Sequence, residues 1–361
     1  MDEPTRIGLI GLGVISDQYL RTLRDHPAVR IVAVADLRAD RATEVAEALP
    51  SARALGVDAL LAADDVDVVV NLTVPAAHAE IARAAIAAGK GVFGEKPLAT
   101  TFADAERVMA DATAAGVAVG SAPDTVLGTG VQTARAAIES GLIGRPTAAT
   151  ATWVSPGHEH WHPNPDFYYR EGGGPHFDMG PYYLTSLVHL LGPVVSVSGE
   201  VSRGRTEREI GSGPRAGERI PVEVDTHVTG TLRHASGALS SVTFSFDAGG
   251  TTAAPIEVHG EAGSLAVPDP NDFDGEVRHH AVGSDGWVAL PVSAGYVGAG
   301  RGVGLVDMVR GHGRASGEIA LHVTEIVTAL PLSAREGRRI DLRTTPAIPP
   351  LVPLTPTEQW R

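Results

Sequence analysis

The stretch from Gly8 to Ser16, "GLIGLGVIS", decides how the chain begins to fold. It begins within an apolar run that starts at Arg6 and leads into a stretch with the pattern of a helix. Gly11, Gly13 and Ser16 match the three small-residue positions of a dinucleotide-binding turn. In such a turn the first glycine makes the tight bend, the second lets the backbone approach a pyrophosphate, and the third small residue allows the helix to pack on the strand. The N-terminus of that helix offers N–H groups to the phosphates.

An acid in the expected place strengthens this interpretation. Asp36 ends the second apolar run, twenty residues after Ser16, where a carboxylate would accept hydrogen bonds from the ribose hydroxyls. Taken alone, Asp36 could be the N-cap of the next helix. Together with the turn it favours a dinucleotide, and NAD over NADP because a carboxylate repels a 2′-phosphate. Arg38 and Arg41 are close enough in sequence to soften this repulsion, so use of both dinucleotides stays open.

The first third of the chain alternates short buried strands with Ala-rich helices. This rhythm predicts an α/β Rossmann domain with a parallel, doubly wound sheet in residues 1–122. The expected strands are residues 6–11, 30–36, 66–72, 91–95 and 117–121, and the expected helices are residues 17–26, 39–49, 78–89 and 101–116.

Residues 123–361 have a different pattern and predict a second, α+β domain for substrate binding and oligomerisation. Helices are expected at residues 130–144, 177–192 and 318–337. Residues 222–248 alternate apolar and polar side chains and are expected to form an antiparallel hairpin that turns at Ala235–Gly237.

Composition limits the partners of the chain. Its 361 residues include 29 basic and 43 acidic side chains, and the net charge of −14 argues against nucleic acid or an anionic membrane surface. The absence of cysteine excludes disulfides and thiolate chemistry. The acidic start of the sequence does not resemble a signal peptide, and we expect a cytoplasmic protein with a small-molecule partner.

Four segments together resemble the glucose–fructose oxidoreductase/inositol dehydrogenase/MocA family. They are the glycine turn, the segment from Pro75 to His78, the "EKP" of residues 95–97 and "GGGPHFDMGPYY" at residues 172–183. The resemblance implies a nicotinamide-binding domain followed by a domain with a large open, mostly antiparallel sheet. It also implies oxidation or reduction of sugars, cyclitols and related polyols. In the family the EKP lysine contacts substrate and nicotinamide, which places Lys96 in the catalytic site.

Asp178 and Tyr182 supply the candidate partners of Lys96. They are four residues apart and would share one face of a helix, although Asp178 could also be an N-cap and Tyr182 a core residue. The inositol dehydrogenases usually have His at the Tyr182 position. Tyrosine there resembles glucose–fructose oxidoreductase and the dimeric dihydrodiol dehydrogenases, in which it transfers a proton. The segment "APDTVLGTG", residues 122–130, departs from relatives that often carry Arg or Asn there.

The loop of residues 155–174 contains alternating histidines and several aromatic residues. His158, His160 and His162 could bind a metal if the segment were extended, but we expect no metal and a sugar pocket instead, with Trp161 against a pyranose face. The predicted substrate-binding residues are His158, Trp161, His162 and His176. The predicted cofactor-binding residues are Gly11, Gly13, Val14, Ile15, Asp36, Leu37, Arg38, Thr73, Pro75, His78, Glu95 and Lys96.

The sequence therefore predicts an NAD(P)-dependent enzyme that transfers hydride to or from a CH–OH group. Two alternatives stay open: a redox-assisted lyase or glycosidase that recycles NAD, with His158, His162 or His176 as an extra base, and a non-catalytic NAD-binding regulator. A homodimer or homotetramer is expected through an apolar face of the second domain's sheet, formed by Val224, Val228, Leu232, Val242 and Phe244.

Overall fold

The computed structural model describes residues 3–361, and the chain divides into two compact units. Unit 1 consists of Met1–Gly128, Tyr296–Leu321 and Thr355–Arg361. Unit 2 consists of Thr129–Gly295 and His322–Leu354. Two segments near the C-terminus, which the sequence analysis assigned to the second domain, thus belong to the compact unit that contains the glycine turn.

Unit 1 contains the predicted parallel sheet. Its six strands lie in the order β3-β2-β1-β4-β5-β6, and every neighbouring pair is parallel. The strands are β1 (Thr5–Ile10), β2 (Val29–Ala35), β3 (Arg53–Ala54), β4 (Val68–Asn71), β5 (Gly91–Gly94) and β6 (Val119–Ser121). The helices are α1 (Ser16–Leu23), α2 (Ala39–Glu47), α3 (Val57–Leu61), α4 (His78–Ala87), α5 (Phe102–Ala115), α9 (Val303–Val309) and α11 (Thr357–Trp360). The strand order reverses between β1 and β4, which is where ligands bind in sheets of this kind.

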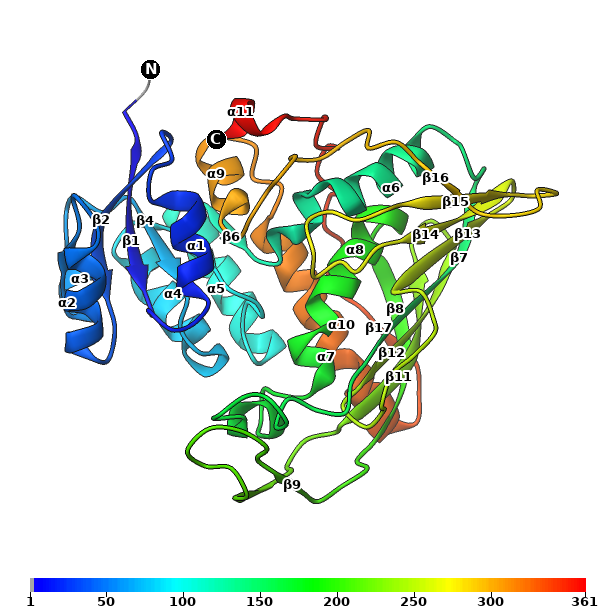
Figure 1. Cartoon of the computed structure of the whole chain (residues 1–361), viewed down its shortest axis with the longest axis horizontal. Helices are drawn as coiled ribbons and strands as arrows, with labels where there is room; N and C mark the ends of the chain where they lie inside the picture. The colour runs from blue at the N-terminus through cyan, green and yellow to red at the C-terminus, as the bar shows by residue number, and fades with distance from the viewer. Residues whose placement is uncertain (1–2) are drawn as a thin grey trace. The chain divides into compact units, whose positions relative to one another are not determined.

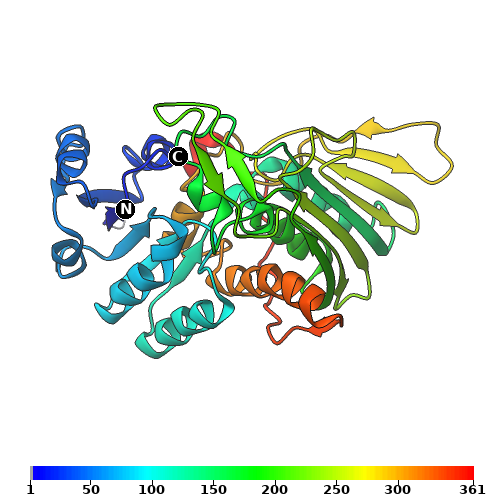
Figure 2. The ribbon, with the colours of Figure 1, turned by 90° about the horizontal axis from the view of Figure 1, so that it is seen from below.

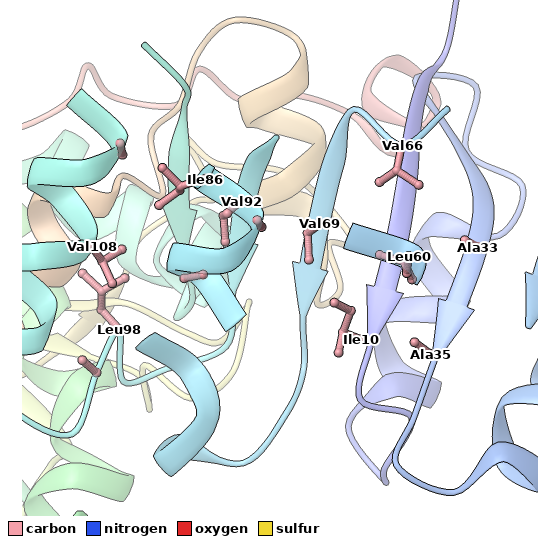
Figure 3. Close-up of a cluster of buried hydrophobic side chains, with 14 of the residues drawn as sticks. Ile10, Ala33, Ala35, Leu60, Val66, Val69, Ile86, Val92, Leu98 and Val108 are labelled. Atoms are coloured by element: carbon pink, nitrogen blue, oxygen red, sulfur yellow. The ribbon is translucent and has the colours of Figure 1, made fainter. Parts of the chain in front are cut away.

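The core of unit 1 explains the apolar runs of its strands. Val69 of β4 and Val92 of β5 point into one buried cluster with Ile86 of α4 and Val108 of α5 (Figure 3). Each such side chain contributes roughly 1.5–3 kcal/mol on burial. The strand β3 was not predicted. Both of its residues are exposed, so no apolar run marks it in the sequence.

Unit 2 is built on a nine-stranded sheet in the order β16-β15-β14-β13-β7-β12-β11-β8-β17. Only β7 and β12 pair in parallel, so the predicted mostly antiparallel sheet is confirmed. The strands are β7 (Pro146–Val154), β8 (Val194–Ser202), β11 (His227–His234), β12 (Leu239–Ser245), β13 (Ile256–Gly260), β14 (Gly263–Val267), β15 (Arg278–Ala281), β16 (Val288–Ala289) and β17 (Ile340–Asp341). The predicted hairpin is confirmed as β11 and β12, and Figure 2 shows the twist of the whole sheet.

Helices cover one face of this sheet. They are α6 (Thr129–Glu139), α8 (Gly180–Leu191) and α10 (Gly317–Glu336) (Figure 1). Gly230 of β11 allows α10 to approach closely, because a Cβ there would lie 2.5 Å from the Leu330 side chain. The short elements α7 (Pro175–Asp178), the 3₁₀ helix η3 (Asp166–Tyr169) and the pair β9 (Glu207–Glu209) and β10 (Arg219–Pro221) complete the unit.

The prediction that an apolar face of this sheet is left free is wrong. Val228, Leu232, Val242 and Phe244 are all buried within the single chain, on the face that the helices cover. Successive side chains of a strand point to opposite faces. The other face therefore carries the alternate residues of these strands, and they are polar: Thr229, Thr231, Arg233, Ser241 and Thr243, exposed or half-buried. Val224 is half-buried and lies outside the strands.

A membrane-spanning segment is not found in the part of the chain that the structure describes. No helix between residues 3 and 361 combines the length and the apolar character needed to cross a membrane.

Candidate functional site

The glycine turn has the backbone that its sequence predicts. Gly11 has a φ of 92°, and a Cβ at this position would lie 2.6 Å from the backbone carbon and oxygen of Leu72. Gly13 differs, because no other group lies within 4 Å of the position of its missing Cβ. Gly11 is therefore required by the protein itself. The open space beside Gly13 is where the backbone could meet a ligand.

Ser16 closes the turn and begins α1. Its side chain is buried, and its hydroxyl donates to the Gly13 carbonyl at 2.6 Å. Val14 is 86% exposed although it is apolar, and Ile15 beside it is half-buried. The turn therefore presents backbone and aliphatic surface at the N-terminus of α1, which suits the pyrophosphate of a dinucleotide.

Asp36 lies beside this turn with both carboxylate oxygens engaged. Its Oδ2 accepts from the Leu12 N–H at 2.7 Å, and its Oδ1 accepts from the Arg38 N–H at 2.9 Å. These bonds fix the carboxylate at the end of β2 and next to the turn. Leu37 is 98% exposed at the same edge. The N-cap alternative does not describe Asp36, because Arg38 is the N-cap residue of α2.

The guanidinium of Arg41 is already engaged by neighbouring groups. Its Nε donates to the Leu12 carbonyl at 3.0 Å, and its Nη atoms pair with Glu44 at 3.0 Å and Asp17 at 3.5 Å. Two acids thus share its charge.

The end of β4 is organised by a buried histidine. His78 Nδ1 lies 2.6 Å from the Pro97 carbonyl oxygen, and its Nε2 lies 3.0 Å from the Thr73 carbonyl oxygen. Burial lowers the pKa of His78, against the effect of these two carbonyls. Because both ring nitrogens face backbone oxygens, His78 connects the Thr73–Pro75 segment to the EKP turn, and its ring is not directed at a ligand.

Helix α1 supports the EKP turn (residues 95–97) through a hydrogen bond to Glu95. Tyr19 of α1 donates its hydroxyl to Glu95 Oε1 at 2.8 Å, and Glu95 Oε2 accepts from the Lys96 N–H at 3.1 Å. Burial, followed by the charge of Glu95, raises the pKa of Tyr19, so this hydroxyl keeps its proton and remains a donor. Lys96 is half-buried at the carboxyl end of β5, and the Lys96–Pro97 peptide is cis.

The sequence holds a further indication about Lys96. Lys90 and Lys96 are the two lysines of the chain, and every other basic residue among the 29 is arginine. Lys90 is buried, and its Nζ donates to the carbonyls of Ala63 at 2.7 Å and Val66 at 2.9 Å. Lysine can release a proton near neutral pH when its surroundings favour it, whereas arginine cannot. A lysine at the end of β5 therefore suits proton transfer.

Asp124 was missed as an important residue by the sequence analysis. It begins the 3₁₀ helix η2 (Asp124–Leu127), three residues after the end of β6, and is buried. Its Oδ2 accepts from the N–H groups of Gly302 at 2.8 Å and Gly304 at 3.0 Å, at the start of α9. Burial raises the pKa of Asp124 to about 6, although the positive charge of Arg301 opposes this change. Asp124 belongs to the segment 122–130, whose sequence departs from that of relatives, and it caps the start of α9.

In unit 2, Asp178 and Tyr182 lie on consecutive short helices. The predicted single helix of residues 177–192 is interrupted at Met179, between α7 and α8, although Met179 keeps right-handed helical φ and ψ values. Asp178 is the last residue of α7 and is not an N-cap. Its Oδ2 lies 2.7 Å from His158 Nε2. Tyr182 is buried within the first turn of α8.

His158 is surrounded by aromatic rings. Tyr168 lies 4.5 Å from its ring centre, Phe246 lies 4.9 Å away and Trp161 lies 5.2 Å away. The Trp161 indole N–H donates to His158 Nδ1 at 3.2 Å. Both ring nitrogens of His158 are therefore used within the protein.

The other two predicted pocket histidines differ in exposure. His162 Nδ1 accepts from the Asn164 N–H at 3.1 Å, and burial lowers the pKa of His162. His176 is buried, and no partner for its Nδ1 is found within residues 3–361. Burial, and then the charge of Arg335, lowers the pKa of His176 to about 3. The imidazole of His176 is therefore neutral at physiological pH.

The loop that carries His158 is fastened by an ion network that the sequence did not indicate. Arg208 of β9 pairs with Glu159 at 2.9 Å and also binds Asp247. The Tyr169 hydroxyl donates to Glu159 and accepts from the His158 N–H at 3.2 Å. The charged groups of Arg208 and Glu159 are buried. Removal of one partner from such a pair typically costs about 3–5 kcal/mol.

The three alternating histidines do not converge on one point. His158 faces Asp178, and exposed His160 lies 3.6 Å from Glu159. Between residues 3 and 361, no group of three or more His, Asp or Glu side chains is arranged to hold a metal ion.

Comparisons with known proteins agree with this architecture. Residues 5–122 match the family described as "Oxidoreductase family, NAD-binding Rossmann fold", and residues 131–266 match "GFO/IDH/MocA C-terminal domain". The myo-inositol 2-dehydrogenase of Thermotoga maritima is 30% identical over 261 residues, which cover 72% of this chain and 74% of that protein. The dTDP-3,4-didehydro-2,6-dideoxy-alpha-D-glucose 3-reductase of Actinomadura kijaniata is 30% identical over 64% of this chain and 70% of that protein.

Solved structures share the fold. A levoglucosan dehydrogenase in complex with NADH and L-sorbose superposes with a TM-score of 0.79 at 22% identity, over 95% of this chain and 100% of that chain. An NAD-binding oxidoreductase from Klebsiella pneumoniae gives a TM-score of 0.78 at 24% identity, over the same shares of the two chains. The two matched domains and the inositol dehydrogenase relative together show that the chain belongs to the Gfo/Idh/MocA family of NAD-binding oxidoreductases.

Proposed function

We propose that this NAD-dependent oxidoreductase transfers a hydride between nicotinamide and the CH–OH carbon of a sugar, a cyclitol or a related polyol. The observation that carries the proposal is the construction of the EKP turn. Glu95 joins α1, which begins at the dinucleotide turn, to the backbone of Lys96 through two hydrogen bonds. A lysine whose backbone is fixed at the carboxyl end of β5 is suited to a substrate hydroxyl at the cofactor edge of the sheet.

The proposed chemistry assigns a task to each of three residues. Oxidation of a carbinol releases a hydride and a proton, and NAD, when bound, supplies the hydride acceptor. Lys96 and Tyr182 manage the hydroxyl proton, and Asp178 provides a negative charge that orients or balances the lysine. Groups fixed in advance in this way stabilise the alkoxide charge that develops during the reaction.

Cofactor binding is proposed for the glycine turn and the polar edge beside it. Asp36 would accept the ribose hydroxyls, and its fixed carboxylate would repel a 2′-phosphate. Arg41 offers little compensation, because Glu44 and Asp17 already pair with it. We therefore propose a preference for NAD over NADP, with Arg38 as the remaining cation that could lessen it.

The lyase alternative needs an additional base, and the structure disfavours two of its candidates. His158 uses both ring nitrogens within the protein. Burial holds the pKa of His176 at about 3, which makes it a very weak base. His162 is the remaining candidate. Net NADH formation in step with substrate consumption would support the dehydrogenase, and turnover without net NADH would support the lyase.

The proposal also covers the oligomeric state and the cellular location of the protein. We propose a homodimer, or a tetramer of dimers, through the open face of the large sheet, which is lined by hydroxyl side chains such as Thr231 and Ser241. We also propose a cytoplasmic enzyme, since the NAD pool that it would use is held there. A monomer in light scattering at micromolar concentration would contradict the assembly.

The deciding experiment is a screen of NAD reduction by the purified protein with a panel of sugars and cyclitols. Lys96→Met should lower turnover by about a hundredfold to ten-thousandfold, the usual effect of removing a general acid–base group. Lys96→Arg is the matched control for charge, and it should be nearly as damaging because arginine does not release its proton. NAD affinity, measured by fluorescence titration, should change far less in both variants.

Three outcomes would contradict parts of this proposal. Full activity of Lys96→Arg would show that only the charge at this position matters. Full activity of Tyr182→Phe would remove the tyrosine from proton transfer. NAD binding without turnover of any polyol would favour the non-catalytic regulator.

A further inference from the structure

A chain of two hydrogen bonds leads from the surface of unit 2 to Asp178. The Trp161 indole N–H donates to His158 Nδ1 at 3.2 Å, and His158 Nε2 lies 2.7 Å from Asp178 Oδ2. An indole nitrogen can only donate, and an ionised carboxylate can only accept. His158 Nδ1 must therefore hold a lone pair, and the single ring proton of a neutral His158 must be on Nε2. The chemistry of the two neighbours thus determines the tautomer.

The surroundings of the ring fix its orientation. Aromatic rings enclose His158, and its backbone N–H donates to the Tyr169 hydroxyl at 3.2 Å. Tyr169 in turn belongs to the buried Glu159–Arg208 network, so the loop cannot shift without breaking an ion pair. The aromatic contacts, the hydrogen bonds of the two ring nitrogens and the hydrogen bond of the backbone N–H together hold the imidazole in place.

The neighbours of the ring agree with this tautomer. A proton on Nδ1 would face the Trp161 N–H donor, and two donors directed at one another repel. The titratable groups around the ring are Asp178 of α7, Tyr168 of η3 and His162 of the same loop, while Trp153 of β7 and Phe246 contribute uncharged faces.

We propose that His158 and Trp161 are positioning residues that hold the Asp178 carboxylate in one orientation for the reaction. The role given to Asp178 rests on the proposed function. His158 is thereby reassigned from direct substrate contact, which the sequence analysis predicted, to support of Asp178. Trp161, which is 57% exposed, remains able to present its ring face to a ligand while its N–H is engaged.

The first test does not depend on activity. In protein labelled with ¹⁵N-histidine, the nitrogen shifts of His158 should show a protonated Nε2 and an acceptor Nδ1, with His158→Gln identifying the signal. A ring protonated on Nδ1 would overturn the proposal. This measurement gives an answer even if no polyol is turned over, so failure of the proposed function and failure of this inference can be told apart.

The second test compares two tryptophans that contact the same ring. Trp161→Phe removes the N–H that donates to Nδ1, so the ¹⁵N shift of His158 Nδ1 should move away from that of a hydrogen-bonded acceptor, and kcat should fall by about fivefold, as expected for one hydrogen bond. Trp153→Phe, the matched control, alters a ring 5.7 Å from His158 and should leave both the Nδ1 shift and kcat in place. Equal shifts in the two variants, or none in Trp161→Phe, would overturn the proposal.

The third test separates a donor from a packing residue. His158→Gln can still donate an N–H toward Asp178, whereas His158→Leu cannot. We expect kcat of the Leu variant to fall at least about tenfold below that of the Gln variant, with KM changing much less, since a charge-assisted hydrogen bond contributes about 1.5–3 kcal/mol. Equal losses in both variants, or a loss confined to KM, would overturn the proposal in favour of packing or substrate contact.

Discussion

Gly11 and Gly13 allow a paired test of the dinucleotide turn, because the fold requires a glycine at position 11, whereas only the proposed cofactor would require one at position 13. In Gly11→Ala, the new Cβ would lie 2.6 Å from the Leu72 carbonyl oxygen and 2.7 Å from the Thr73 nitrogen, and these backbone atoms cannot rotate away. A left-handed conformation costs an L-residue about 1–2 kcal/mol, and overpacking adds about 1–3 kcal/mol. Gly11→Ala should therefore lose about 2–5 kcal/mol of stability and also bind NAD poorly.

Gly13→Ala should give a different result. Its Cβ would enter open space, and Gly13 is not among the glycines with positive φ, so the melting temperature of the free protein should stay near that of the wild type. NAD affinity should nevertheless fall at least tenfold, about 1.4 kcal/mol, because the methyl group occupies the space that the pyrophosphate would approach.

Thermal unfolding without cofactor and titration with NAD measure the two effects separately. The reasoning would be refuted if Gly11→Ala melted like the wild type, or if Gly13→Ala bound NAD with unchanged affinity. The second result would also show that the ligand does not approach this turn.

Three further predictions concern other parts of the chain. We expect the wild type to bind NAD at least tenfold more tightly than NADP, about 1.4 kcal/mol, and Asp36→Ser should narrow or reverse this difference. Equal affinities of the wild type for NAD and NADP would contradict the role of this acid. Tyr19→Phe removes the hydroxyl of α1 that donates to Glu95, and Glu95 supports the backbone of Lys96. Turnover should therefore fall more than NAD affinity, and an unchanged kcat would contradict this prediction. His189→Leu removes a buried imidazole for whose ring nitrogens no partner is found within residues 3–361, and whose pKa burial lowers from 6.5 to about 3. Because the unfolded chain takes up this proton below about pH 6.5 and the folded chain does not, the wild type loses stability as the pH falls toward 3, and the melting temperature of the variant should exceed that of the wild type by a margin that grows from pH 6.5 toward pH 3.

The sequence alone was sufficient for the features that depend on neighbouring residues. The β-branched runs predicted the parallel sheet, and the glycine turn and the acid at the end of the second strand lie side by side as expected. These features depend on the chemistry of a few consecutive residues, so the signal is complete within a short stretch of chain.

Alternation along the strands shows how far such local signals extend. It predicted the β11–β12 hairpin and two faces of different polarity. It could not say which face would be covered, and the apolar residues Val228 and Phe244 were assigned to the free face. Their burial is decided by α10, which begins more than seventy residues after β12 and reaches the sheet where Gly230 leaves room for Leu330.

The partners of buried polar groups were decided by tertiary structure alone. Asp124 caps a helix that starts near residue 303, and Arg208 joins Glu159, 49 residues away, to Asp247, 39 residues away. Asp178 was predicted from its spacing to Tyr182, yet its observed partner His158 lies 20 residues before it. A charged or polar side chain looks the same in the sequence whether it faces solvent or a distant partner. Its hydrogen bonds exist only after the chain has brought separate segments together and removed the water between them.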